Sequence, residues 1–235
     1  MRRAVRIVGT LMIGAGVLML AWAILVWRWQ DPFTALYTHW KQHELAGQYK
    51  HVLERWQPPT ALKRTRNLAG EERLVRREAT LFDHSAKQGS AIGRIVIGRL
   101  GLNMILVNGT DSSTLTKGPG RDLRTYMPGQ DRLVYIAGHR TTYLAPFSHI
   151  ESIRDGDYIR LEMPYGTFVY RAFRHFVVPA SDLAMLHSPD HELLRLQACH
   201  PRFFASHRYI VDARLVRVEP RGGAAYTLGA PPTNS

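Results

Sequence analysis

Cysteine is almost absent from this chain, since Cys199 is the single cysteine among 235 residues. One thiol cannot form an internal disulfide, and it cannot supply a zinc site built from several cysteines. His200 and His207 could share a metal ion, but both are better explained as loop residues. No glycine-rich loop of the phosphate-binding kind occurs either. The sequence therefore predicts no metal and no cofactor.

Acidic residues are also scarce: 19 stand against 31 lysines and arginines, which gives a net charge of +12. In a cytosolic protein such an excess would suggest a nucleic-acid partner. No motif that combines aromatic and basic residues accompanies it here, and much of the excess lies in the short runs 63–66 and 73–77. We interpret the charge as a general attraction to anionic lipid head groups or wall polymers, and we predict no nucleic-acid partner.

Long apolar runs are limited to one. Residues 7–27 are uncharged and almost wholly apolar, about the length needed to cross a bilayer. Three arginines precede the run and tryptophans gather at its far end, which predicts a cytoplasmic N-terminus (1–6) and the rest of the chain outside the cell. A cleaved signal peptide is the alternative. The length of the run and the lack of a small-x-small cleavage site favour a retained single-pass anchor in the cell membrane.

Residues 28–90 are polar and strongly charged, and we predict an extracytoplasmic stalk or linker there that is partly helical. Spaced apolar positions over 34–57 predict an amphipathic helix, and a shorter helix is expected over 71–81.

From residue 91 onward, short apolar segments alternate with glycine and proline turns, which is typical of a β-barrel or β-sandwich. The periodicity is lost after Glu219, so 220–235 is expected to be a disordered tail. The sequence thus predicts a mainly β domain over 91–219. Its expected strands are 92–97, 104–108, 133–137, 158–163, 167–178, 194–199 and 209–216.

An alternation of apolar residues leads into Cys199, and a second strand-like run begins at Arg208. Two neighbouring strands joined by a short loop would place Cys199 and Arg208 side by side at one end of a sheet. A guanidinium group stabilises the thiolate, which is the nucleophilic form of cysteine. An unpaired thiol outside the membrane is prone to oxidation, so a reactive role is favoured over the alternative of a buried structural cysteine.

A nucleophilic cysteine also needs a group that carries protons, and His139 is the best candidate. It follows the strand-like run 132–137 and Gly138, a residue that allows close backbone approach. His200 is nearer to Cys199 in sequence, but adjacent residues of a strand point to opposite faces.

These residues resemble the sortases, cysteine transpeptidases of the Gram-positive cell surface. The resemblance is carried by the run 137–140 (Ala-Gly-His-Arg), by Arg208, and by the approach 194–199, which is similar to the TLxTC signature with alanine at the second threonine. The segments 126–130 and 139–143 are most similar to actinobacterial class E sortases. The resemblance covers about 91–219 and implies a closed sortase-type β-barrel with short helices, preceded by one transmembrane helix.

The resemblance also implies a reaction. Cys199 would cleave a C-terminal sorting signal related to LAxTG or LPxTG between threonine and glycine, through a thioester, and a cell-wall precursor amine would accept the secreted protein. His139 would protonate the leaving amine and deprotonate the incoming one, and Arg208 would stabilise the oxyanion. The expected substrate-binding residues are Tyr143, Leu196 and Ala198.

Other functions stay open at this point. An extracellular Cys-His peptidase or amidase acting on peptidoglycan would not require an arginine on the strand after the cysteine. A non-enzymatic, membrane-tethered β-module would leave Cys199, His139 and Arg208 far apart. The triplet 31–33 (Asp-Pro-Phe) resembles the lid of class C sortases, but a chain turn at the bilayer surface is favoured.

Overall fold

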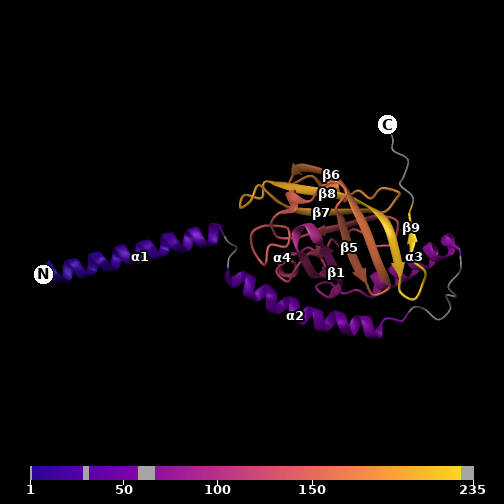
Figure 1. Ribbon diagram of the computed structural model, residues 1–235, viewed down its shortest axis with the longest axis horizontal. Coiled ribbons are helices and arrows are strands. Elements are labelled where there is room, and N and C mark those ends of the chain that lie inside the picture. Colours follow the sequence, from indigo (N-terminus) through magenta and orange to yellow (C-terminus); the bar gives the residue numbers. More distant parts are fainter. Residues whose placement is uncertain (1, 29–31, 58–66, 229–235) are drawn as a thin grey trace.

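The computed structural model describes residues 2–28, 32–57 and 67–228. Three α-helices come first in the chain and the strands follow (Figure 1). In chain order the elements are α1 Arg2–Arg28, α2 Pro32–Arg55, α3 Leu68–Ser85, β1 Ala91–Ile97, η1 Gly98–Leu100, β2 Leu102–Asn108, α4 Ser112–Leu115, β3 Gly120–Arg121, β4 Leu133–Ala137, η2 Ile150–Ser152, β5 Tyr158–Met163, β6 Gly166–Pro179, η3 Leu183–Leu186, β7 Leu193–His200, β8 His207–Pro220 and β9 Tyr226–Thr227.

Within the described residues, eight strands close into a barrel in the order β6-β5-β1-β2-β3-β4-β7-β8. The closing step is the long antiparallel pairing of β6 with β8, which runs from Gly166↔Pro220 to Pro179↔His207. Closure satisfies the backbone groups that a sheet edge would expose. The predicted closed barrel is thereby confirmed.

Alternation along the strands fills the barrel with apolar side chains. In β5, for example, Ile159, Leu161 and Met163 are buried while the residues between them are exposed or half-buried. Such alternation is expected where one face of a strand meets the core and the other faces outward. The interior is completed by large aromatic side chains such as Tyr170 and Phe168, which are fully buried.

Helix α1 points away from the barrel (Figure 1). Its segment Arg2–Ile24 is long and apolar enough to cross a membrane, and none of the helix window that meets this test is buried. An apolar helix with no protein partner is stable where lipid surrounds it. The helix therefore fits the membrane anchor predicted over 7–27.

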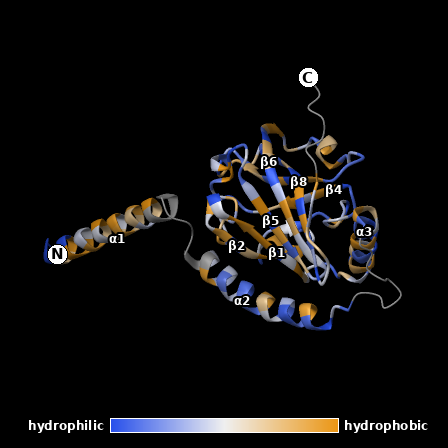
Figure 2. Ribbon diagram, turned by 45° about the vertical axis from the view of Figure 1, so that its right-hand side comes forward, coloured by the Kyte–Doolittle hydropathy of each residue, from blue (hydrophilic) through white to orange (hydrophobic). Residues whose placement is uncertain are grey.

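Helix α2 lies along the outer surface of β1 and β2, with hydrophilic residues on much of its length (Figure 2). Leu45 and Tyr49 are buried against Ile105 and Val107. The side chain of Gln42 accepts a hydrogen bond from the Ile105 backbone N–H at 2.6 Å and donates to its carbonyl at 3.1 Å. Gln42 thus pairs with the strand as a neighbouring backbone would.

Helix α3 contributes directly to the main core through Val75, Ala79 and Phe82. Its N-terminus is capped by Asn67, whose side chain accepts from the Gly70 N–H at 2.8 Å, the usual role of an asparagine there.

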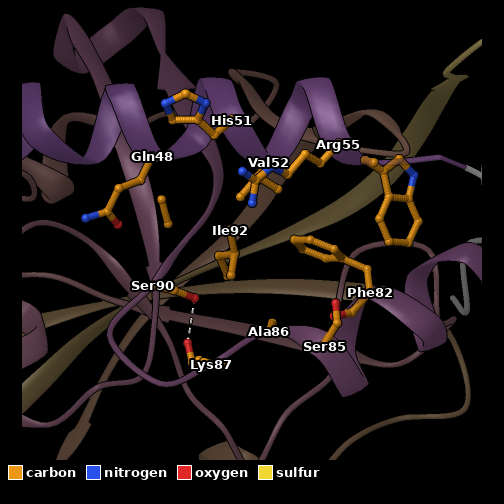
Figure 3. Close-up of a pocket in the computed structure, with 12 residues that line it drawn as sticks. Gln48, His51, Val52, Arg55, Phe82, Ser85, Ala86, Lys87, Ser90 and Ile92 are labelled. Atoms are coloured by element: carbon orange, nitrogen blue, oxygen red, sulfur yellow. Dashed lines mark hydrogen bonds between the residues drawn. The ribbon is translucent and has the colours of Figure 1, made fainter.

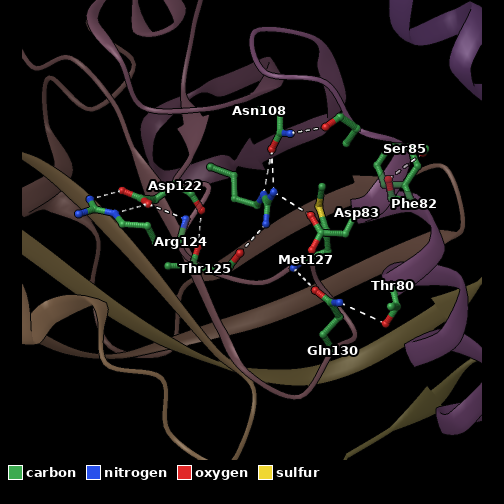
Figure 4. A network of polar contacts seen from close by, with 12 residues as sticks. Thr80, Phe82, Asp83, Ser85, Asn108, Asp122, Arg124, Thr125, Met127 and Gln130 are labelled. Carbon is green, nitrogen blue, oxygen red and sulfur yellow. Dashed lines mark hydrogen bonds and ion pairs between the residues drawn. The ribbon is translucent and has the colours of Figure 1, made fainter.

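A buried guanidinium attaches α3 to the barrel. Arg121 of β3 donates to Asp83 of α3 at 2.9 Å and to Asn108 of β2 at 2.9 and 3.0 Å, and Figure 4 shows these acceptors around it. Asn108 in turn donates to the Ala86 carbonyl at 3.0 Å, just past the end of α3. A buried charge is tolerated only when it is paired and hydrogen-bonded, and here the pairing joins three elements.

The prediction of a stalk over 28–90 is therefore wrong in one respect. Most of the described part of that stretch is helical, but α2 and α3 pack against the barrel and belong to its folded body. The sequence pattern alone did not predict this packing, because α3 is rich in charged residues and its buried side chains lie on one face only.

The C-terminal expectation needs a similar correction. Strand β9 pairs with Arg217 and Val218 of β8, and Tyr226 and Leu228 pack against the main core. The folded body thus extends to residue 228. The rest of the predicted disordered tail, 229–235, lies outside the described residues.

The two helices leave a pocket where they meet the start of β1 (Figure 3). It has a volume of about 470 Å³, with apolar walls from Val52, Phe82 and Ile92 and basic side chains, Arg55 and Lys87, at its margin. Trp56 also lines the pocket and packs edge-on against Phe82, with ring centroids 5.3 Å apart.

We predict that replacing Phe82 by alanine lowers the free energy of unfolding by about 3–5 kcal/mol, the usual cost of emptying a buried aromatic site. The neighbouring Leu81, which is 42% exposed, is the matched control, and its replacement by alanine should cost about 0.5 kcal/mol or less. Urea unfolding of the two variants measures the difference. Equal, small effects would mean that α3 is not part of the cooperative fold.

Candidate active site

Cys199 lies near the end of β7, directly opposite Arg208 of β8 in the antiparallel register. Directly paired residues of two antiparallel strands point to the same face of the sheet, with Cβ atoms about 5 Å apart. The structure thus brings Cys199 and Arg208 together as the sequence predicted.

His139 reaches the same place from the other side of β7. Strands β4 and β7 are parallel, and their last pair is Ala137↔Gln197. The pairing continues with a hydrogen bond from Gly138 N–H to the Gln197 carbonyl at 3.0 Å, so His139 follows two residues after Ala137 as Cys199 follows two after Gln197. The three predicted catalytic residues therefore lie on adjacent strand ends.

The faces of β7 divide its residues into two sets. Leu194, Leu196 and Ala198 have no exposed surface and belong to the main core. Gln197 and Cys199 alternate with them and face outward, where both are half-buried. The expectation that Leu196 and Ala198 bind substrate is therefore wrong, because their side chains fill the barrel interior on the face opposite to Cys199.

Close packing holds the loop that carries His139. A Cβ atom on Gly138 would lie 2.6 Å from the Phe147 ring, so only glycine fits between the strand and that ring. Phe147 is fully buried and its N–H donates to the His139 carbonyl at 3.1 Å. The backbone of His139 is thus fixed by the core below it.

The His139 ring is partly shielded from water. Its Nε2 is buried and has no hydrogen-bond partner among the described residues. The centroids of the His139 and Tyr143 rings lie 5.0 Å apart, and the two ring planes are tilted by 41°. Burial lowers the pKa of His139 below its usual 6.5, so the neutral imidazole is favoured at pH 7. Tyr143, a predicted substrate contact, thus lies against the predicted base.

The guanidinium of Arg208 is anchored by its own loop. Its Nη1 donates to the Ala205 carbonyl at 2.7 Å and to the His207 carbonyl at 2.9 Å. Within the described part of the chain, Nε and Nη2 donate to no protein acceptor. Those donors are therefore available to an oxyanion or a peptide carbonyl next to Cys199.

Sequence reasoning missed Arg140, which is 6% exposed and supports the other side of Cys199. Its Nη1 donates to the Cys199 carbonyl at 3.1 Å and contacts His200 Nδ1 at 2.8 Å, and its Nη2 pairs with Glu151 at 2.8 Å. His200 thus contacts Arg140 on the face of β7 opposite to the Cys199 thiol. Arg140 was visible in the sequence only as the neighbour of His139, since Glu151 reaches it through the tertiary fold.

The outward face beyond Cys199 is another feature that the sequence did not reveal. The Tyr135 hydroxyl donates to the Gln197 side chain at 2.8 Å. Arg195 pairs with Asp212 at 2.6 and 2.9 Å and donates to the Met185 carbonyl at 2.8 Å, which ties the β6–β7 connection to the sheet. An apolar cluster covers the same face. It consists of Leu133, Tyr135, Ala137 and Leu193, with Leu115, Met185 and Leu186 packed against them.

Among the residues that the structure describes, no three histidine, cysteine or acidic side chains lie close enough to hold an ion. The groups that remain are a thiol, an imidazole and a guanidinium on three adjacent strand ends. Together they supply a nucleophile, a proton carrier and an anion binder, which are the parts needed for acyl transfer through a cysteine.

Comparisons with known proteins agree with this class. The family model of the sortase domain matches residues 95–216, just over half of the chain. The chain therefore belongs to the sortase family, and it is a cysteine transpeptidase.

Individual sortases are similar over most of their length. Sortase D of Bacillus subtilis is 26% identical over 160 residues, which cover 66% of this chain and 79% of that protein. Sortase E1 of Streptomyces coelicolor, solved with a tripeptide in its active site, is 26% identical with a TM-score of 0.54 and is matched over 95% of its chain and 58% of this one. Sortase E of Streptomyces avermitilis is 28% identical with a TM-score of 0.52, over 93% of its chain and 57% of this one.

A fold match extends into the helices. The Sortase D5 transpeptidase of Clostridium perfringens has a TM-score of 0.59 and covers 75% of this chain and 98% of its own, at 24% identity.

We predict that the imidazole of His139 titrates with a midpoint below 6.5 in the folded protein, because burial disfavours its charged form. Replacing Tyr143 by alanine admits water to the ring and should raise the midpoint. Histidine resonances followed by NMR from pH 5 to 8 give the values, and the spectrum of a His139→Ala variant assigns the signal.

The lowered pKa of His139 also sets the direction in which the stability of the folded protein changes with pH. As pH falls below about 6.5, the unfolded chain binds a proton at this residue that the folded chain resists, so the contribution of His139 to folding falls. An unchanged midpoint in the Tyr143→Ala variant would mean that Tyr143 does not shield the ring.

Proposed function

We propose that this protein is a membrane-anchored sortase that cleaves a C-terminal sorting signal related to LAxTG or LPxTG between threonine and glycine and transfers the protein to a cell-wall amine. One observation supports it above the others: the register of β7 with β4 and β8 aligns His139, Cys199 and Arg208 on one outward face. The substrates are secreted proteins that carry the signal.

The catalytic roles follow from the chemistry of the three groups. His139 takes the proton of the Cys199 thiol, the resulting thiolate attacks the threonine carbonyl carbon, and the free donors of Arg208 stabilise the oxyanion. The carbon–nitrogen bond to glycine breaks, and His139 gives its proton to the leaving amine, which leaves a thioester on Cys199. An incoming amine then attacks the thioester, His139 takes its proton, and the new amide leaves as the thiolate is restored.

Tyr143 is the substrate contact that the geometry supports. Its ring packs on His139, and its backbone has a positive φ of 53°, an unusual conformation for a tyrosine that tends to occur at functional sites. We extend the peptide-binding surface to Gln197, which is half-buried and shares the outward face of Cys199.

Class E is the subclass that we propose. The segments 126–130 and 139–143 support it, and so does the likeness to the two Streptomyces enzymes. Sortase D of Bacillus subtilis is similar to the same extent, so the peptide preference is the property that separates the two classes.

The location that we propose places the N-terminus in the cytoplasm and the barrel outside the membrane. The arginines that precede the apolar part of α1 support this orientation, since positive residues are retained on the cytoplasmic side.

The decisive experiment incubates the protein with LAxTG, LPxTG and scrambled peptides, with and without a glycine-based amine acceptor, and detects products by mass spectrometry. We expect cleavage after threonine and an amide product when the amine is present. Hydrolysis alone at every amine concentration would favour a peptidase or amidase instead. Cys199→Ala should abolish both cleavage and the thioester adduct.

The two histidines near Cys199 make a matched comparison. We predict that His139→Ala reduces turnover at least about a hundredfold, the contribution expected of a general acid–base group. His200→Ala should have a smaller effect, because His200 contacts Arg140 on the opposite face. A larger loss for His200→Ala would identify a different proton carrier.

Arg208 and Arg202 make a second pair. Arg208→Lys should lower turnover about a hundred- to a thousandfold, because an ammonium group lacks the paired donors that hold an oxyanion. Arg202 is half-buried in the loop that joins β7 to β8, and its Nε is buried without a partner in the described residues, so Arg202→Ala should be mild. The reverse order of effects on one sorting peptide would assign the anion-binding role to Arg202.

A further inference from the structure

Large apolar side chains are exposed in two segments that are far apart in the sequence. Leu36 and Trp40, on the first turns of α2, are 73% and 60% exposed. Phe203 and Phe204, in the loop between β7 and β8, are 60% and 80% exposed. Exposed apolar clusters of this size mark surfaces that contact another molecule or a membrane.

Contacts in the structure place both segments at the active-site end of the barrel. The Tyr143 N–H donates to Thr34 Oγ1 of α2 at 3.2 Å, and the Tyr37 and Tyr143 ring centroids are 6.5 Å apart. Tyr143 packs on His139, which lies level with Cys199 at the start of the β7–β8 loop. Figure 1 shows this loop, in yellow-orange, at the end of the barrel nearest α1.

The position of α1 indicates that this end of the barrel lies near the bilayer. The candidate span belongs to a helix that ends at Arg28, and α2 begins at Pro32. The chain between these two residues spans at most about 15 Å even when fully extended. The first turns of α2 are therefore held near the bilayer that α1 crosses.

The chemistry of these turns suits the region of the lipid head groups. Tyr37 and Trp40 combine an apolar ring with a polar group, and such side chains concentrate at membrane interfaces. The Lys41 ammonium lies 4.3 Å from the centre of the Trp40 ring and pairs with Glu44 at 2.9 Å. Beyond Trp40 the exposed face of α2 becomes polar. The residues there are His43, Glu44, Gln48, Lys50 and His51.

We infer that these side chains form a bilayer-docking surface, made of Leu36, Tyr37, Trp40, Phe203 and Phe204, that lies in the head-group region of the anionic membrane spanned by α1. The net charge of +12 and Arg202, next to Phe203, favour anionic lipid. The inference rests on the proposed membrane anchoring. The docked surface holds Cys199 beside the membrane, where a substrate tethered in the same bilayer emerges.

The single cysteine makes a direct test practicable. A full-length Cys199→Ala protein has no cysteine, so one can be introduced at Leu36 or Phe204, or at the control Leu81, an exposed leucine on α3. Figures 1 and 2 both show α3 on the side of the barrel away from α1. Each variant carries an environment-sensitive fluorophore and is inserted as one copy per lipid nanodisc.

Lipids that carry a shallow quencher then report contact with the head-group region. We expect quenching at residues 36 and 204 to be several-fold stronger than at residue 81, and stronger in discs of anionic phosphatidylglycerol than in zwitterionic phosphatidylcholine. Equal quenching at all three positions overturns the inference. So does a fluorophore at 36 or 204 that is shielded from water without being quenched by lipid, since protein would then cover it.

Two control measurements distinguish a missing docking surface from a missing anchor or an unfolded barrel. Incorporation of the chain into discs reports whether α1 anchors it, so weak quenching in incorporated protein overturns the docking surface alone. Circular dichroism of each labelled variant shows that the barrel is folded. A signal that appears only when several copies share one disc would assign the surface to contacts between copies and would also overturn the inference.

Discussion

The lateral pairing of β7 is the constraint on which the site depends. This strand pairs in parallel with β4 and antiparallel with β8, so two hydrogen-bonded ladders set the positions of His139 and Arg208 relative to Cys199. A shift of one residue in either ladder would turn the affected side chains to the opposite face. The catalytic arrangement is therefore specified by the backbone, and none of the three side chains needs to hold another in place.

Buried polar groups fix both ends of this strand. Just before β7, Glu192 accepts hydrogen bonds from the Gly129 N–H at 2.9 Å and the Tyr170 hydroxyl at 2.5 Å, and burial raises its pKa to about 7. At the other end, Arg140 holds the Cys199 carbonyl and pairs with Glu151. Leaving any of these buried groups without its partner would be costly, so each one opposes movement of β7.

The helices that precede the barrel have two roles. Helix α3 completes the core, and α2 covers β1 and β2 while its first turns reach Tyr143 next to His139. The chain that follows the candidate membrane helix thus contacts the loop of the proposed base before it enters the barrel. This arrangement links the proposed anchor to the active site by packing.

The sequence by itself determined the parts that depend on local pattern. Alternation and turn residues were enough to predict a β-barrel or β-sandwich, and the resemblance to sortases narrowed this to a closed barrel. One long apolar run predicted the membrane helix, and the strand pattern around the single thiol indicated Cys199, His139 and Arg208 as neighbours. Only the tertiary structure decided which side of each strand faces the core. It removed Leu196 and Ala198 from the predicted surface, brought Glu151 to Arg140, and packed α3 into the barrel. The physical reason is that burial depends on residues far away in the chain, and a local pattern does not contain them.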